Sequence, residues 1–332
     1  MLQLLRKIAF PFSLVYAMVV HLRNFFYNTG VFKSKSYQTP TLGVGNLSVG
    51  GTGKTPMIEY LVRLLEGHKI AVLSRGYKRR SKGFLLADAN SSVLDLGDEP
   101  YQLHQKFPQI TVAVDIDRRN GIAQLETAVK PEVILLDDAF QHRRVKPNFS
   151  ILLTAYGQLY VDDWYLPTGN LRDSKREAKR ADIIIVTKCP RPLSKEEQRA
   201  IIDKLKPLPH QKVLFSKLEY TQVLKGGEVE NLHLLAIKET KIALVTGIAS
   251  PEPLVVYLKS LGLVFEHFEF GDHHNFSDKD VWQFKDYELV LTTEKDYVRL
   301  RGKLENLFYL EVAHSFGSED QAFLEKTVKD LI

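Results

Sequence analysis

The stretch LGVGNLSVGGTGKTP, from Leu42 to Pro56, decides the fold of this chain of 332 residues. An apolar run ends in closely spaced glycines, which are followed by Lys54, Thr55 and a segment with helical spacing of its apolar residues. Glycines without a Cβ let successive backbone N–H groups turn inward around an anion, and the lysine and hydroxyl that follow can reach phosphates and Mg²⁺. The order of strand, glycine-rich loop and helix therefore predicts a loop that binds a nucleoside triphosphate.

The predicted contacts of this loop with the triphosphate are eight consecutive residues. They are Ser48, Val49, Gly50, Gly51, Thr52, Gly53, Lys54 and Thr55. The general pattern GxxxxGK[ST] has glycine where this chain has Ser48, which is a departure from the motif. The alternative interpretation is a glycine-rich turn between strand and helix that binds no ligand.

A second motif, VILLDDAFQHRR, runs from Val133 to Arg144. Four apolar residues end in Asp137 and Asp138, which places two carboxylates at the carboxyl edge of a predicted strand. A phosphate-loop protein needs a magnesium ligand at that edge, so both aspartates are predicted metal ligands together with Thr55. The alternative is an acidic pair that only caps the end of the strand.

Predicted strands and helices alternate along most of the chain, which favours an α/β fold with a parallel sheet of the phosphate-loop NTPase type. We expect residues 1–28 to form an amphipathic N-terminal helix and residues 29–216 to form the nucleotide-binding domain. Alternating segments around two adjacent glycines predict a β-hairpin linker over residues 217–237. Residues 238–332 are expected to form a second, smaller α/β domain.

Composition is that of a globular protein, with 44% hydrophobic and 26% charged residues. The 45 lysines and arginines exceed the 40 acidic residues by five, an excess that favours anionic partners without naming one. For any single cluster of cations, a solvated face is the favoured interpretation. The single cysteine, Cys189, excludes an internal disulfide, fits a reducing compartment and is expected to be buried.

An apolar run from Ile8 to Val20 lies close to the N-terminus. It is too short to span a bilayer, and it lacks the cleavage site of a signal peptide. Its continuation through Leu22, Phe25 and Phe26 favours an amphipathic helix that lies in a membrane interface. The alternative is a helix packed on its own domain.

A phosphate loop alone does not name the group that accepts the phosphoryl. A kinase also needs a group that orients or deprotonates the attacking hydroxyl, and cations that neutralise the transferred phosphoryl oxygens. Candidates for the first task are Asp98, Asp272, His273 and His274. Candidates for the second task are Arg119, Arg143, Arg172 and Lys295. Each of these residues could instead be a helix cap or a solvated surface group.

Taken together and in order, the motifs resemble the tetraacyldisaccharide 4′-kinases of lipid A biosynthesis. The motifs that carry this resemblance cover nearly the whole chain: VGNLSVGGTGKTP, SRGY, GDEP, DDAFQHR, LPTGNLRD, DHH and TEKD. The resemblance implies that ATP phosphorylates the 4′-hydroxyl of a tetraacylated glucosamine disaccharide 1-phosphate, which gives the 1,4′-bisphosphate lipid IVA. It also implies Mg²⁺, a lipid substrate, and attachment through the N-terminal helix to the cytoplasmic face of the inner membrane. We expect a monomer that binds no nucleic acid.

The resemblance also implies roles for individual residues. Lys54 and Arg172 would act on the transferred phosphoryl group, and Asp98 would be the general base, with His273 coupled to it from the second domain. Asp98 and His273 should then face each other beside the phosphate loop. Thr55 with Asp137 and Asp138 would hold the magnesium, and His142 would lie close to the metal edge. The competing hypothesis is a membrane-associated ATPase switch without an acceptor substrate.

Two positions depart from the family's pattern. The family often has glutamate and proline after the arginine of LREP, where this chain has Asp173 and Ser174. It often has glycine in DDGFQHR, where this chain has Ala139. The second change is small and is expected to be tolerated, whereas the first leaves the role of Asp173 open.

Overall fold

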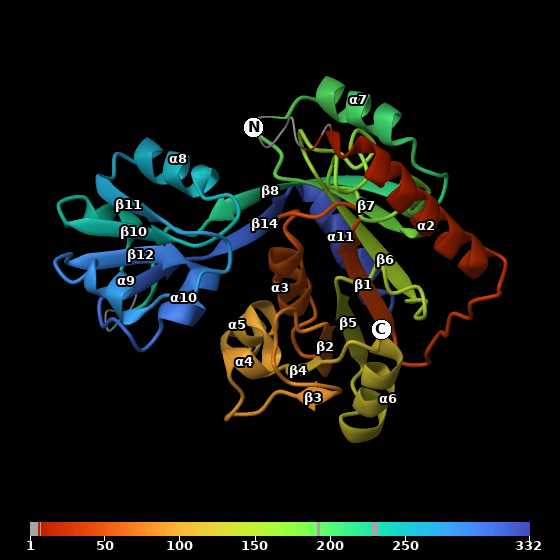
Figure 1. Ribbon diagram of the computed structural model, residues 1–332, viewed down its shortest axis with the longest axis horizontal. Coiled ribbons are helices and arrows are strands. Elements are labelled where there is room, and N and C mark those ends of the chain that lie inside the picture. The colour runs from red at the N-terminus through yellow and green to blue at the C-terminus, as the bar shows by residue number, and fades with distance from the viewer. Residues whose placement is uncertain (1–5, 7, 191–192, 228–231) are drawn as a thin grey trace.

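The computed structural model describes residues 6, 8–190, 193–227 and 232–332. Two sheets organise this part of the chain (Figure 1). In sheet order, the nine strands of the larger sheet are β14 (Val312–Phe316), β8 (Lys212–Tyr220), β7 (Ile183–Thr187), β6 (Phe149–Ala155), β1 (Thr41–Asn46), β5 (Val133–Asp137), β2 (Ile70–Ser74), β4 (Thr111–Val114) and β3 (Leu85–Leu86). The smaller sheet has five strands, β11 (Phe265–Glu269), β10 (Ile242–Thr246), β12 (Leu289–Thr293), β13 (Leu307–Leu310) and β9 (Lys225–Gly226).

The predicted α/β class is confirmed, because neighbouring strands in the centre of both sheets are parallel. Antiparallel pairing occurs at the edges, where β3 pairs with β4, β14 with β8 and β9 with β13. In the larger sheet β1 lies between β5 and β6, and Val44 is opposite Asp137. The carboxyl ends of these strands meet at one edge, so the phosphate loop and the two aspartates lie side by side.

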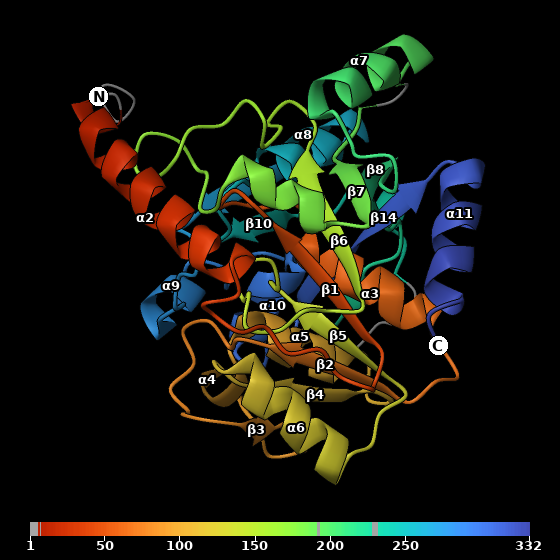
Figure 2. The same cartoon turned by 90° about the vertical axis from the view of Figure 1, so that its right-hand side faces the viewer.

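Helices surround both sheets (Figures 1 and 2). The larger body carries α2 (Phe10–Asn28), α3 (Lys54–Leu64), α4 (Val93–Leu96), α5 (Asp98–Lys106), α6 (Arg118–Ala128), the 3₁₀ helix η1 (Lys175–Arg180), α7 (Lys195–Leu205) and α11 (Ser318–Lys329). The smaller body carries the 3₁₀ helix η2 (Leu234–Ile237), α8 (Glu252–Ser260), α9 (Asp278–Trp282) and α10 (Glu294–Leu300).

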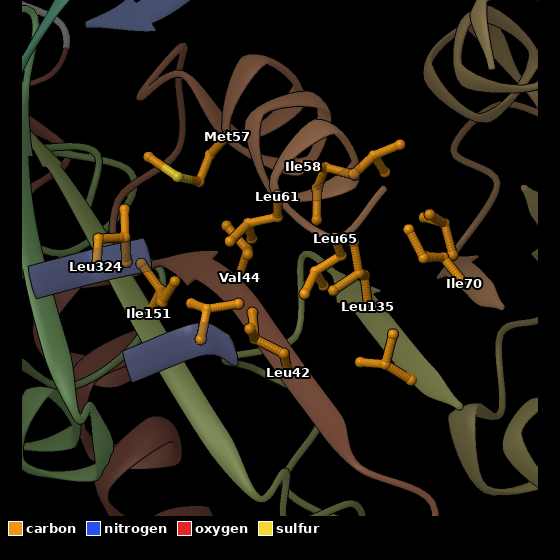
Figure 3. Close-up of a cluster of buried hydrophobic side chains, with 14 of the residues drawn as sticks. Leu42, Val44, Met57, Ile58, Leu61, Leu65, Ile70, Leu135, Ile151 and Leu324 are labelled. Carbon is orange, nitrogen blue, oxygen red and sulfur yellow. The ribbon is translucent and has the colours of Figure 1, made fainter. Parts of the chain in front are cut away.

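Helix α3 is fixed to the sheet by an apolar face at helical spacing. Met57, Ile58 and Leu61 are fully buried, and they lie over strands β1, β5 and β6 (Figure 3). Removing each of these side chains from water contributes roughly 2 kcal/mol. The N-terminus of α3 is therefore held rigidly at the sheet edge, where its positive end faces the phosphate loop.

The two bodies are joined differently from the predicted hairpin linker over residues 217–237. Strand β8 belongs to the larger sheet as far as Tyr220, and it pairs along its end with β14. A short antiparallel pairing does exist, since the N–H of Leu224 donates to the carbonyl of Leu232 at 2.8 Å, but residues 228–231 lie outside the described residues. The chain thus crosses between the bodies twice, once after β8 and once before β14 (Figure 1).

The expected extent of the smaller domain, residues 238–332, also differs from the structure. Strand β14 is the edge strand of the larger sheet, and Leu324 and Val328 of α11 are buried in the larger body's core. The reason is physical: alternate residues of β14 bury one face against α3, while β8 offers an edge with free hydrogen-bonding groups. Residues 312–330 therefore return to the larger body.

Candidate functional site

The predicted phosphate loop is a tight turn between β1 and α3. Gly50 and Gly53 have φ values of 115° and 85°, in the left-handed region that favours glycine. Gly53 precedes the first helical residue, Lys54, and no side chain caps this helix end. The free N–H groups of the first turn are therefore available to an anion, as the motif predicts.

The loop is held in place from three sides. The side-chain amide of Asn46 donates to the hydroxyl of Thr52 at 2.8 Å, and the hydroxyl of Thr187 donates to the carbonyl of Thr52 at 2.9 Å. The N–H of Val49 donates to the carbonyl of Asn170 at 2.7 Å. These anchors come from β1, β7 and the LPTGNLRD segment, so contacts within the protein itself hold the loop in this conformation.

A buried histidine ties the loop to the strand that joins the two bodies. Nε2 of His314, in β14, lies 2.9 Å from the carbonyl oxygen of Gly53, and its Nδ1 lies 2.9 Å from the hydroxyl of Ser216. A Cβ built on Gly53 would lie only 3.0 Å from His314 Nε2. Glycine is therefore required there by close packing as well as by φ.

We expect acid to destabilise the protein through His314. Burial lowers the pKa of this histidine from 6.5 to about 4, so folding favours the neutral ring. The stabilisation is complete above pH 6.5 and is lost as the pH falls toward 4, by up to roughly 3 kcal/mol. The measurement is the free energy of unfolding at several pH values, for the wild type and His314→Asn. The deficit of the variant should shrink in acid, and a deficit that is independent of pH would contradict this account.

Asp137 ends β5 with one satisfied and one unsatisfied carboxylate oxygen. The hydroxyl of Ser74 donates to its Oδ2 at 3.0 Å, whereas the buried Oδ1 has no partner among the described residues. Burial, together with the negative charges of Glu99 and Asp138, raises the pKa of Asp137 to about 6. An anionic oxygen in this state is suited to receive a cation.

Asp138 lies among cations. Its backbone is in the left-handed region, with φ of 53°. Nη1 of Arg172 donates to Oδ2 of Asp138 at 2.9 Å, and Nζ of Lys54 lies 3.7 Å from Oδ1. Burial acts to raise the pKa of Asp138, but hydrogen bonds from Arg172 and the charge of Lys54 outweigh it and hold that pKa far below its usual range. The two residues predicted to act on the phosphoryl group are thus together beside the loop.

The donor set fits a magnesium ion. Thr55, in the first turn of α3, is buried and offers a hydroxyl, and Asp137 offers its unpaired Oδ1. Among the described residues there is no group of three or more His, Cys, Asp or Glu side chains that could hold a metal by themselves. Mg²⁺ does not need such a group, because it is usually bound by one or two protein oxygens together with phosphate oxygens and water.

Asp98 and His273 meet between the two bodies. Nδ1 of His273, in the loop before α9, lies 2.6 Å from Oδ2 of Asp98, in the first turn of α5. Both side chains are largely buried, with exposed fractions of 19% and 16%. Burial acts to raise the pKa of Asp98, but hydrogen bonds and charge from Arg299, with a smaller contribution from His273, lower it below its usual value. The expected pairing across the two bodies is therefore present.

Glu99 links this pair to the phosphate loop. Its carboxylate forms an ion pair with Lys295 of α10, and it also interacts electrostatically with Lys54 and Asp138. A second ion-pair group lies nearby, in which Nζ of Lys106 is 2.6 Å from Glu294 of the smaller body. The GDEP and TEKD motifs therefore both lie in the contact between the bodies, with the phosphate loop beside it.

Other candidates from the sequence lie elsewhere. Arg119 is exposed and pairs with its neighbour Asp117, and His274 lies 3.1 Å from Asp280 of α9. Arg143 is buried against Glu177 and the carbonyl of Asn24. The side chains of His142 and Cys189 are largely removed from solvent: burial lowers the pKa of His142 to about 4 and raises that of Cys189 to about 12.

The sequence did not point to Arg299, and it assigned no role to Asp173. Arg299, which contacts Asp98, belongs to no motif, although its i+4 spacing from Lys295 places both on one face of α10. Asp173 is fully buried, and it accepts hydrogen bonds at 2.8 Å from Arg23 and from Asn24. Asp173 therefore anchors α2 to the LPTGNLRD segment.

Helix α2 turns two of its polar residues inward. Ser13 and Asn24 are buried against the larger body, while Phe12 and Met18 are 70% and 64% exposed. Further exposed apolar residues of this helix are Leu14, Val15, Val19, Leu22 and Phe25. Figure 2 shows α2 along the outside of the larger body. None of the described helices combines the length and hydrophobicity needed to cross a bilayer.

The fold defines a phosphate-loop nucleotide-binding protein with a second α/β body that contacts the first one beside the loop. Residues 5–332 match the sequence profile of the LpxK family, described as tetraacyldisaccharide-1-P 4′-kinase. The chain belongs to this family.

Similar proteins agree with this assignment. The tetraacyldisaccharide 4′-kinase of Flavobacterium johnsoniae is 50% identical over 329 residues, which cover 97% of this chain and 96% of that protein. The enzyme of the same name from Flavobacterium psychrophilum is 46% identical, with 98% and 96% covered. A crystal structure of LpxK from Aquifex aeolicus in complex with ATP superposes with a TM-score of 0.80 at 31% identity, covering 98% of this chain and 99% of that one.

Proposed function

We propose that this chain transfers the γ-phosphoryl group of ATP to the 4′-hydroxyl of a tetraacylated glucosamine disaccharide 1-phosphate. Family membership supports this activity over nearly the whole chain. The observation that carries it is the 2.6 Å contact of Asp98 with His273 beside the phosphate loop. A nucleotide switch has no need for a carboxylate and imidazole from two bodies at that place, whereas a phosphotransferase must deprotonate its acceptor.

Each of the proposed catalytic residues has a task that its position supports. Asp98 accepts the proton of the attacking hydroxyl, with His273 as its partner. Oδ1 of Asp98 accepts from Nε of Arg299 at 3.2 Å and has a lone pair left for the hydroxyl. Lys54 and Arg172 neutralise charge on the transferred phosphoryl oxygens, and the N–H groups of residues 48–55 bind the triphosphate.

Magnesium would be held by Thr55 together with Asp137, the aspartate with the unpaired oxygen, and with Asp138 on the same edge. When bound, it would supply positive charge to the phosphate oxygens. Asp138 would also keep Lys54 and Arg172 in place until the nucleotide binds.

We further propose that α2 lies in the interface of the cytoplasmic face of the inner membrane, as a peripheral anchor of a monomer. A helix that buries its polar face and exposes its apolar face needs a partner other than water for that face. The acceptor's acyl chains are themselves in the bilayer, so the anchor would bring the site to its substrate.

Charge on the outer face of α2 is expected to weaken membrane binding. The double substitution Val15→Glu with Met18→Glu removes two apolar side chains that would contact lipid, a loss of roughly 2 kcal/mol or more. We expect the partition coefficient onto phosphatidylethanolamine–phosphatidylglycerol vesicles to fall at least about tenfold in a sedimentation assay. Val256→Glu with Phe323→Glu, at exposed apolar positions of α8 and α11, adds the same two charges as a matched control and should bind like the wild type. Equal binding by all three proteins would remove α2 as the anchor.

The competing switch ATPase is tested by the dependence of ATP turnover on the acceptor. With Mg²⁺ and ATP alone, we expect slow ADP release, and with added tetraacyldisaccharide 1-phosphate in detergent micelles a rise of at least about a hundredfold. Each ADP should be matched by one phosphorylated lipid. An equal rate of ATP turnover with and without the lipid would favour the switch ATPase.

A further inference from the structure

Arg299 stands at the centre of the contact between the two bodies. Its Nη2 donates to Oδ2 of Asp98 at 2.5 Å and its Nε to Oδ1 at 3.2 Å, so the guanidinium covers the carboxylate as a fork. The same Nη2 lies 3.0 Å from Nδ1 of His273. The Arg299 side chain is only 6% exposed. Both members of the proposed proton-accepting pair are thus in contact with one buried cation.

The guanidinium is itself fixed by a second carboxylate. Nη1 of Arg299 donates to Oδ1 of Asp296 at 3.1 Å, and Oδ2 of Asp296 accepts from the N–H of Gly247 at 2.8 Å and from the hydroxyl of Thr293 at 2.7 Å. The carbonyl of Gly247 in turn accepts from the N–H of His273 at 3.0 Å. Arg299 and His273 are therefore positioned by the same residues of the smaller body.

We propose that Arg299 is the positioning residue of the phosphoryl transfer reaction, which holds the Asp98 carboxylate against His273 and keeps it ionised for proton transfer. This inference rests on the proposed function. A guanidinium does not give up its proton, so Arg299 is not itself the base. It determines where the two other groups lie and in which protonation state Asp98 enters the reaction.

The charges around Asp98 favour Arg299 over any other cation for this task. Lys295, on the same helix, forms its ion pair with Glu99. Asp272 lies on the solvent side of His273, with its Oδ2 3.9 Å from Nε2, and the ring of Tyr77 packs at 5.8 Å from the imidazole. Of these groups only Arg299 forms hydrogen bonds with both oxygens of Asp98. Its charge lowers the pKa of that carboxyl against the opposing effect of burial.

Two substitutions at position 299 separate the effect of the positive charge from the effect of the hydrogen-bond geometry. Arg299→Gln removes the charge, whereas Arg299→Lys keeps the charge but cannot form the fork. We expect kcat to fall roughly 10- to 100-fold in Arg299→Gln. The acidic limb of its kcat/KM profile should move up by about one pH unit, because the carboxyl loses its cation. Arg299→Lys should keep the limb of the wild type and lose only part of kcat. KM for ATP should change less than about twofold in both, since neither contacts the phosphate loop.

Arg301→Gln is the matched control. Arg301 lies two residues further on and bonds Gln105 across the same contact, but it does not touch Asp98. We expect its pH profile and kcat to equal those of the wild type. Thermal unfolding followed by circular dichroism shows whether each variant is folded. If Arg299→Gln does not fold, the kcat of Arg299→Lys tests the inference instead. It must fall, because the lysine cannot form both hydrogen bonds to Asp98.

An unchanged kcat and acidic limb in folded Arg299→Gln would overturn the inference. The same result for Arg299→Gln and Arg301→Gln would also overturn it, because the effect would then belong to the contact in general. A wild type that transfers no phosphoryl group to the lipid would defeat the proposed function itself. Wild-type transfer with an unaltered Arg299→Gln profile would defeat only the role of Arg299.

Discussion

Replacing Asp98 by asparagine is expected to lower kcat for phosphoryl transfer roughly a thousandfold, which is within the usual contribution of general base catalysis. The carboxamide keeps the size of the side chain and one oxygen for Arg299, but it cannot accept the proton of the attacking hydroxyl. The measurement is the initial rate of lipid phosphorylation at saturating ATP and acceptor.

ATP binding should hardly change in Asp98→Asn, because the phosphate loop is held by Asn46, Thr187 and Asn170 and not by Asp98. A dissociation constant for ATP within about twofold of the wild type is therefore part of the expectation. Asp278→Asn, an exposed carboxylate of the smaller body, is the control for loss of one negative charge. A kcat within a few-fold of the wild type in Asp98→Asn would remove the base assignment.

Lys54→Ala is expected to lower kcat/KM for ATP by roughly a thousandfold or more. The variant loses the loop cation that reaches the terminal phosphates, and it also leaves Asp138 with less positive charge around it. The measurement is single-turnover transfer from radiolabelled ATP to the lipid. Lys204→Ala, which removes an exposed lysine paired with Asp162, should behave as the wild type.

A full rate in Lys54→Ala would mean that the phosphates do not lie in the loop. The contact of His314 with the carbonyl of Gly53 would then hold a loop that does not bind the phosphates. Loss of transfer with normal unfolding behaviour is the expected result.

The features that sequence could predict are local ones. The strand, glycine loop and helix around Lys54 follow from residues within about fifteen positions, and the parallel sheet follows from their alternation with further strands. Asp137 and Asp138 could be placed beside the loop because parallel strands share one carboxyl edge. Asp98 and His273, which are 175 positions apart in the chain, could be brought together only through the family resemblance.

The features that sequence missed depend on distant contacts. The return of β14 to the larger sheet is decided by the open edge of β8, nearly a hundred residues earlier, and no local pattern records that pairing. Arg299 looks like one more basic residue on a short helix until Asp98 is placed opposite it. The role of Asp173 depends on Arg23 and Asn24 of α2, which lie about 150 positions away.

The orientation of α2 also could not be predicted from local sequence. The apolar run from Ile8 to Val20 predicts a hydrophobic face but does not say which way that face points. Its outward orientation follows from buried hydrogen bonds on the opposite face, such as that of Asn24 with Asp173 at 2.8 Å. Those contacts leave the apolar face of α2 exposed, and this exposed face is the physical basis of the membrane proposal.

The central claim is that phosphoryl from ATP ends on the sugar of an acylated disaccharide. The direct measurement is tandem mass spectrometry of the lipid after incubation of the purified protein with ATP, Mg²⁺ and a tetraacyldisaccharide 1-phosphate. We predict a 1,4′-bisphosphate whose second phosphate fragments with the distal glucosamine, formed by the wild type and not by Asp98→Asn. A lipid of unchanged mass beside accumulating ADP, or a phosphate on any other position, would contradict the account.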